Sequence, residues 1–132
     1  MKNILISLVI FLAACNQPTS SSFADRVNRA DQLEATPTGI LFSTALLNKY
    51  GGTITKLVRE CYASNPNLEK DAFVLVADID SNGDFTNIVV QPETAPSRCY
   101  AEKINGLHMK ASKPIGFGDS AYPVVLRVKY NK

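Results

Sequence analysis

The sequence predicts an α+β domain in which helices pack on one face of a three-stranded antiparallel sheet. Three features support this prediction: two β-rich runs joined by an Asn-Gly turn, apolar residues at helical spacing on either side of that hairpin, and a third β-rich run near the C-terminus. The 132 residues suffice for one core, and 45% hydrophobic and 20% charged residues are typical of a globular domain. A net charge of +2 is too small to indicate a nucleic-acid partner.

The N-terminal residues predict export and a lipid anchor. An apolar run at residues 4–12 follows Lys2, is too short to span a bilayer, and leads through small residues to Cys15. The ending Leu-Ala-Ala-Cys resembles a bacterial lipobox, which implies that residues 1–14 are a lipoprotein signal peptide and that Cys15 carries a lipid. Two alternatives stay open: a plain secreted protein with an incidental cysteine, and an N-terminal transmembrane anchor.

The residue after this cysteine is Asn16. In lipobox proteins an Asp at this position favours retention in the inner membrane, so the resemblance implies the periplasmic face of the outer membrane. Each buried CH₂ of an acyl chain contributes about 0.8 kcal/mol, and two or more chains make attachment stable.

Residues 15–36 are predicted to be the lipidated cysteine and a flexible tether, and residues 37–132 the folded domain. The segment 16–22 (NQPTSSS) is polar and uncharged, so it cannot bury a core. Two alternatives are open for residues 23–34, a short helix or part of the linker, because their apolar positions have helical spacing among many charges. The Pro and Gly that follow mark the boundary.

Two helical segments are predicted before the hairpin. The first, residues 40–50, has a helical apolar pattern whose members include Ile40, Leu41, Ala45 and Leu47. The adjacent Gly51 and Gly52 disfavour a single long helix. The second segment, residues 54–63, starts after Thr53 as N-cap and has an apolar stripe of Ile54, Leu57, Val58 and Cys61.

Residues 73–80 (FVLVADID) and 85–91 (FTNIVVQ) predict a β-hairpin. Asn82-Gly83 favours a two-residue type I′ turn. That turn would pair residues whose numbers sum to 165: Ile79 with Thr86, Ala77 with Ile88, and Leu75 with Val90. One face would then carry Phe73, Leu75, Ala77, Ile79, Ile88 and Val90. The other face would carry Val74, Val76, Asp78, Asp80, Phe85, Asn87, Val89 and Gln91.

A third helix and a last strand complete the predicted domain. The helix covers about residues 98–108 with Ser97 as a possible N-cap, and the strand covers residues 122–130. A right-handed crossover would place this strand beside the first one, antiparallel to it, in the order 2-1-3. Arg127 and Lys129 would then share a face with the hairpin acids, Asp78 and Asp80.

Two cysteines remain after the lipobox cysteine, and they predict a disulfide. Cys61 and Cys99 each lie on the inward stripe of a different helix, and both helices must cover the same sheet face. An exported domain sits in an oxidising compartment, where a disulfide is the expected state. A metal or redox site is the alternative, but there is no CxxC motif, and one His cannot complete a zinc ligand set.

The order of these motifs resembles the TonB C-terminal domain and, more closely, its cysteine-bearing relatives of the AgmX gliding-motility type. The resemblance covers residues 53–131 and rests on Cys61-Tyr62, the Asn-Gly hairpin, Cys99 and the closing VVLRVKY strand. It implies a periplasmic fold whose edge strand accepts a peptide by strand addition. Partner-binding candidates on that strand are Tyr122, Val125, Arg127 and Lys129. TonB has a transmembrane helix coupled to an inner-membrane motor and a long Pro-rich spacer, whereas this chain is expected to have a lipid and a short tether.

No motif predicts catalysis. Asp78-x-Asp80-x-Asn82-Gly83-Asp84 matches half of a calcium loop, but its twelfth position is Val89 in place of a carboxylate, so a hairpin turn with solvated acids is favoured. His108 is the only imidazole and has no identified nucleophile nearby. Gly116-Phe117-Gly118 lacks the Lys-Ser/Thr of a phosphate loop. We expect no enzyme activity, cofactor, metal ion, nucleic acid or small-molecule substrate.

Two function classes follow from these features. The first is a binding or scaffolding lipoprotein that holds an envelope protein partner at the edge strand and is attached to the membrane through its lipid. The second is an immunity-type protective lipoprotein that blocks a toxin, for which the small size, lipid and disulfide are equally suitable.

Overall fold

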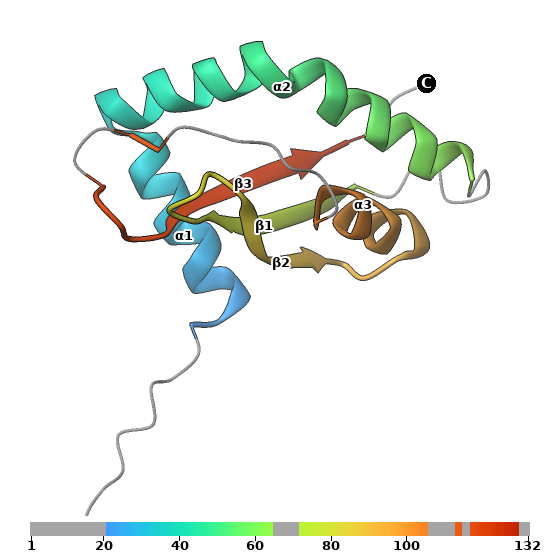
Figure 1. Cartoon of the computed structure of the whole chain (residues 1–132). Coiled ribbons are helices and arrows are strands. Elements are labelled where there is room, and N and C mark those ends of the chain that lie inside the picture. The colour runs from blue at the N-terminus through green and yellow to red at the C-terminus, as the bar shows by residue number, and fades with distance from the viewer. Residues whose placement is uncertain (1–20, 65–71, 106–112, 115–116, 130–132) are drawn as a thin grey trace, which may run out of the picture.

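The computed structural model describes residues 21–64, 72–105, 113–114 and 117–129 of the chain. The elements are, in order, α1 (Phe23–Glu34), α2 (Pro37–Ala63), β1 (Phe73–Ile79), β2 (Phe85–Gln91), α3 (Ala95–Asn105) and β3 (Tyr122–Val128) (Figure 1). The strands form one antiparallel sheet in the order β2-β1-β3, as predicted. The predicted fold class is therefore confirmed, with β1 in the centre and β2 and β3 at the two edges.

The helix α1 settles the alternatives left open for residues 23–34. Ser22 caps it: the Asp25 backbone N–H donates to the Ser22 hydroxyl at 3.1 Å, and the Asp25 carboxylate accepts the Ser22 backbone N–H at 3.2 Å. The folded part of the described chain thus begins near Ser22. The tether predicted for residues 15–36 therefore includes residues that belong to the folded domain.

The helices lie on both faces of the sheet, and the prediction of one covered face is wrong in this respect. The helices α2 and α3 pack on the face of Leu75, the face predicted to be buried. On the opposite face, Arg26 of α1 forms an ion pair with Asp78 at 3.4 Å, and Asp31 of α1 forms one with Arg127 at 2.7 Å. Asp78 and Arg127 share a face as expected, but each is paired with a residue of α1, which packs on this face of the sheet.

The helix α2 is continuous, so the prediction of two segments separated by Gly51 and Gly52 is wrong. Thr36 caps its first turn and Pro37 occupies the first position, where its missing N–H costs nothing. Buried and half-buried side chains recur at spacings of three and four residues through the glycine pair, and they are Phe42, Leu46, Tyr50, Ile54, Leu57, Val58 and Cys61. Burial of this stripe outweighs the low helix propensity of two glycines.

The same register corrects the apolar pattern predicted for the N-terminal half of α2. Ile40, Leu41 and Leu47 are 55%, 72% and 55% exposed, and Ala45 is exposed as well. The core-facing residues are Phe42 and Leu46.

The two glycines of α2 give a first testable prediction. A Cβ added at Gly51 or at Gly52 would meet nothing within 4 Å. Replacing Gly52 with Ala should therefore raise the free energy of unfolding by about 0.5–1 kcal/mol, since Ala loses less backbone entropy in a helix. Urea unfolding followed by circular dichroism measures the change. A decrease for Gly52→Ala would mean that α2 is interrupted at this point.

The hairpin keeps the predicted register at one end and shifts by one residue at the other. Leu75 pairs with Val90 as predicted, but Ile79 pairs with Phe85, whereas Thr86 was expected. The shift moves Phe85 to the core face, where it is 3% exposed. Gly83 has φ +83° and donates its N–H to the Asp80 carbonyl at 3.1 Å. Asn82 lacks the positive φ that a type I′ turn requires, so a three-residue loop replaces that turn.

A β-bulge in β2 causes the shift. Asn87 and Ile88 together oppose Ala77, and Asn87 adopts φ +50°, a conformation that Asn tolerates better than most residues. Arg26 donates to the Asn87 carbonyl at 2.7 Å, and the Asn87 side-chain amide donates to Asp78 at 3.1 Å. Residues of α1 thus hold the bulge, which explains why the hairpin sequence alone predicted the wrong register.

The helix α3 begins earlier than predicted. Thr94 and Ser97 bond reciprocally: the Thr94 N–H donates to the Ser97 hydroxyl at 2.8 Å, and the Ser97 N–H donates to the Thr94 hydroxyl at 3.3 Å. Ser97 is therefore inside the first turn, and Thr94 takes the capping position predicted for Ser97. The predicted end of the helix near His108 lies outside the described residues.

The disulfide between Cys61 and Cys99 joins α2 to α3 above the sheet, as predicted, with a Cα–Cα distance of 5.7 Å. Both cysteines are followed by buried tyrosines. The rings of Tyr62 and Tyr100 both pack against that of Phe73, with centroids 6.3 and 5.5 Å from it. These tyrosines are therefore part of the hydrophobic core.

Burial of Tyr100 predicts a loss of stability in alkali. Its hydroxyl has no hydrogen-bond partner among the described residues, and burial raises the pKa of Tyr100 well above the usual value. The unfolded tyrosine ionises near pH 10. Stability should therefore fall as the pH rises above about 10, because only the unfolded state then releases the proton. Tyr100→Phe should make this fall shallower in urea titrations between about pH 9.5 and 11.5; equal slopes would contradict the assignment.

Candidate functional site

The strand β3 lies at one edge of the sheet that the described residues form, and two helices flank it from opposite sides. The helix α1 covers one face and α2 the other, and they are joined by the tight turn at Ala35 and Thr36. Gly39 makes this turn possible, because a Cβ there would lie 1.9 Å from the Leu33 carbonyl oxygen. Figure 1 shows α2 running alongside β3.

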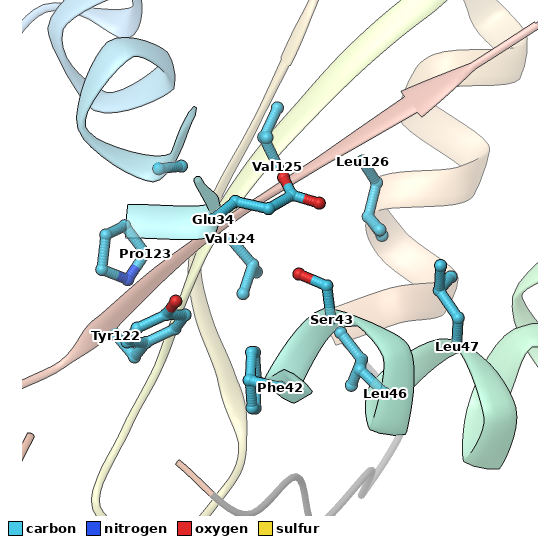
Figure 2. A pocket seen from close by; sticks show the side chains of 11 residues that line it. Glu34, Phe42, Ser43, Leu46, Leu47, Tyr122, Pro123, Val124, Val125 and Leu126 are labelled. Atoms are coloured by element: carbon cyan, nitrogen blue, oxygen red, sulfur yellow. The ribbon is translucent and has the colours of Figure 1, made fainter. Parts of the chain in front are cut away.

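A groove lies beside the first five residues of β3 (Figure 2). Its walls come from α1, α2 and the strand, and its lining residues are Ala30, Glu34, Phe42, Ser43, Leu46, Leu47, Tyr122, Pro123, Val124, Val125 and Leu126. Figure 2 shows Val124 pointing toward Phe42 and Leu126 toward Leu47. The groove is therefore mainly apolar, and the 55% exposed Leu47 extends its wall toward solvent.

One acid lies in this apolar groove. Figure 2 shows the Glu34 side chain reaching from the end of α1 over the space beside β3. Burial raises the pKa of the Tyr122 hydroxyl, and the negative charge of Glu34 raises it further. Within the described residues Glu34 has no ion-pair partner. Its negative charge also contributes to the raised pKa of Arg127, so it acts along this part of β3.

A second, basic groove continues along β3 past Leu126. It lies between α2 and the end of the strand, and its lining residues are Ile54, Thr55, Val58, Arg59, Arg127, Val128 and Lys129. Arg127 donates to Asp31, which raises the pKa of Arg127. Arg59 and Lys129 are exposed and have no ion pair within the described part of the chain. The edge of β3 thus runs from an acidic end to a basic end.

The four predicted partner-binding residues differ in their placement. Tyr122 is 4% exposed, and its ring packs against Phe42 and Phe117 with centroids 4.9 and 4.7 Å away, so it is a core residue at the groove floor. Val125 is half-buried in the first groove. Arg127 is exposed but held by Asp31, and Lys129 is exposed just after the strand. The predicted lipid site, Cys15, lies outside the described residues.

Sequence reasoning missed every groove residue that comes from a helix. The spacing of Phe42 and Leu46 with Ile54 could have identified them, had the stripe been followed through the glycines. No local signal identifies Glu34 as a groove residue, because its position depends on how α1 turns into α2.

The hairpin acids have structural roles. The Asp80 carboxylate accepts the N–H groups of Asn82 and Asp84 at 2.8 and 3.0 Å, and Asp78 is held by Arg26 and Asn87. Among the described residues, no three His, Cys, Asp or Glu side chains come together as a metal site would require. His108 and Gly116 lie outside those residues. None of the helices in the described ranges has the length and apolar character needed to cross a bilayer.

Comparisons with protein-family models, with curated proteins and with solved structures found no match for this chain. The likeness to TonB C-terminal domains and to the lipobox therefore stays a prediction from the sequence motifs.

Proposed function

We propose that this protein is a lipid-anchored protein of the periplasm that binds an envelope protein partner by strand addition at β3. The observation that supports this most strongly is the apolar groove beside the edge strand. An edge strand presents backbone N–H and C=O groups that an extended peptide can pair with, and an adjoining groove can receive alternate side chains of that peptide. Pro123 lacks an N–H, so pairing would use the part of β3 after it.

The other edge of the sheet is less suited to this role. The bulge at Asn87 interrupts the regular edge of β2, and Pro92 directly follows the strand. Bulges are a common protection of edges against unwanted pairing. On β3, seven consecutive residues pair with β1 without a register shift.

Position-specific photo-crosslinking in native membranes tests the binding site. A photoreactive residue in place of Lys129 lies at the basic end of the β3 edge, and one in place of Val89, which is 39% exposed on β2, is the matched control. We expect Lys129 to crosslink to one defined segment of a membrane-associated protein and Val89 to give no such product. Equal crosslinking from both positions, or crosslinking from Val89 alone, would overturn the assignment to β3.

The mass of the native protein tests the anchor separately. The proposed mature protein lacks residues 1–14 and carries a thioether-linked diacylglycerol on Cys15, so its mass should exceed that of residues 15–132 by the mass of the lipid. An unmodified full-length chain would contradict the lipid anchor and leave the β3 site to be judged by crosslinking.

A further inference from the structure

We propose that the β3 edge selects an extended peptide in which an acidic residue stands four positions before a basic residue. The residues directly next to each of these two charged residues are apolar. This inference rests on the proposed function and specifies the chemistry of the partner segment. It follows from three properties of the two grooves: the order of their charges, the distance between those charges, and the position of the apolar wall.

The charges at the two ends of the edge are opposite. Glu34 lies in the groove beside the first half of β3, while Arg59 and Lys129 line the groove at its end. Inside the described ranges none of the three has an ion-pair partner. A peptide along this edge would therefore gain from a basic side chain near Glu34 and an acidic side chain near Lys129.

The strand geometry sets the direction and the spacing. Antiparallel pairing is slightly more stable per residue than parallel pairing, so we take the added strand to run opposite to β3. It then begins near Lys129, which places the acidic residue first. Figure 2 shows Glu34 beside Val125, four residues before Lys129. At 3.3 Å per residue this is about 13 Å, and an even spacing puts both charges on one face of the peptide.

The apolar wall of the groove would contact the face of the peptide opposite to its charged residues. Val125 and Lys129 share the sheet face covered by α1, where Glu34 also originates. The apolar wall comes from α2 on the opposite face, through Phe42, Leu46 and Leu47. Alternation along an extended peptide directs its charged residues toward the face of Glu34 and Lys129 and its apolar residues toward α2. Arg59 belongs to α2 but lines the same groove as Lys129, so it adds positive charge at that end of the edge.

Three synthetic peptides of equal length test this selection on the purified full chain. The probe Thr-Val-Glu-Val-Thr-Val-Lys-Val-Thr has the proposed pattern, a second peptide exchanges Glu and Lys, and a third carries Gln at both positions. Fluorescence anisotropy at low ionic strength measures the three Kd values. Since exposed ion pairs contribute little individually, we expect the proposed pattern to bind about 3–10-fold more tightly than the Gln peptide, and the exchanged peptide more weakly than both.

A charge-reversed variant gives the decisive comparison. The combined changes Glu34→Lys, Arg59→Glu and Lys129→Glu should reverse the preference, so that the exchanged peptide binds best. The control changes Glu102→Lys and Arg98→Glu, two exposed residues of α3 away from both grooves. This control should keep the original order of affinities.

The outcomes separate the inference from the proposed function. Equal binding of all three peptides, with protection of β3 amides from hydrogen exchange, would overturn the charge selection and leave strand addition supported. An unchanged preference in the charge-reversed variant would also overturn the charge selection. Absence of both binding and β3 protection, together with no crosslinking from Lys129, would overturn strand addition itself.

Discussion

Replacing Cys61 and Cys99 together by Ala is expected to lower the free energy of unfolding by about 4 kcal/mol. The disulfide closes a loop with a sequence separation of 38 residues. Cross-linking such a loop removes entropy from the unfolded chain, and the chain-entropy relation for this length gives about 4 kcal/mol. For a domain of this size, that is a large share of a total stability of roughly 5–15 kcal/mol.

Chemical unfolding of the oxidised protein, the reduced protein and the double variant measures this effect. Reduction and double substitution should give similar losses, since both remove the same constraint from the unfolded chain. A loss below about 1 kcal/mol in the double variant would show that residual structure in the unfolded state already brings the two helices together.

The second large effect is expected at the junction between α1 and α2. A Cβ at Gly39 would lie 1.9 Å from the Leu33 carbonyl oxygen and 2.9 Å from the Glu34 Cα. Both are backbone atoms, so no side-chain rotation relieves the clash. Gly39→Ala should therefore lower the free energy of unfolding by roughly 2–4 kcal/mol, in the upper range of single substitutions, because the two helices must separate. Urea unfolding measures the loss.

The Gly39 variant should also impair the groove, because α1 contributes Ala30 and Glu34 to its wall. The affinity for the probe Thr-Val-Glu-Val-Thr-Val-Lys-Val-Thr should fall even under conditions where the protein remains folded. Gly52→Ala is the matched control: it adds the same methyl group to the same helix, where it meets nothing within 4 Å, and should keep the affinity. If Gly39→Ala were as stable as the natural chain, the close packing of α1 on α2 would be wrong.

The central parts of the fold were predictable because each carries a local signal. Alternation in residues 73–80 identified the buried face of β1, and the two β-rich runs joined by Asn-Gly identified the hairpin. The inward positions of Cys61 and Cys99 on their helices predicted the disulfide. These features depend on periodicity within short stretches, which backbone geometry translates directly into facing side chains.

The errors in the predicted fold arise where distant residues decide local structure. Gly51 and Gly52 disfavour a helix by themselves, yet the core contacts on either side stabilise α2 through them. The hairpin register follows the turn only until Asn87, where Arg26 of α1 holds a bulge. In both places tertiary contacts outweigh a local preference, which for each glycine in a helix is about 1 kcal/mol.

The sequence by itself determined the strands, their order and the pairing of two cysteines, since a period of two or of 3.6 residues selects which side chains face the core. Only the tertiary structure decided that α1 belongs to the domain and that its Glu34 lies in an apolar groove beside Val125. The reason is physical: the position of Glu34 depends on the angle at which two helices meet at Gly39, and close packing sets this angle between residues that no periodic pattern connects.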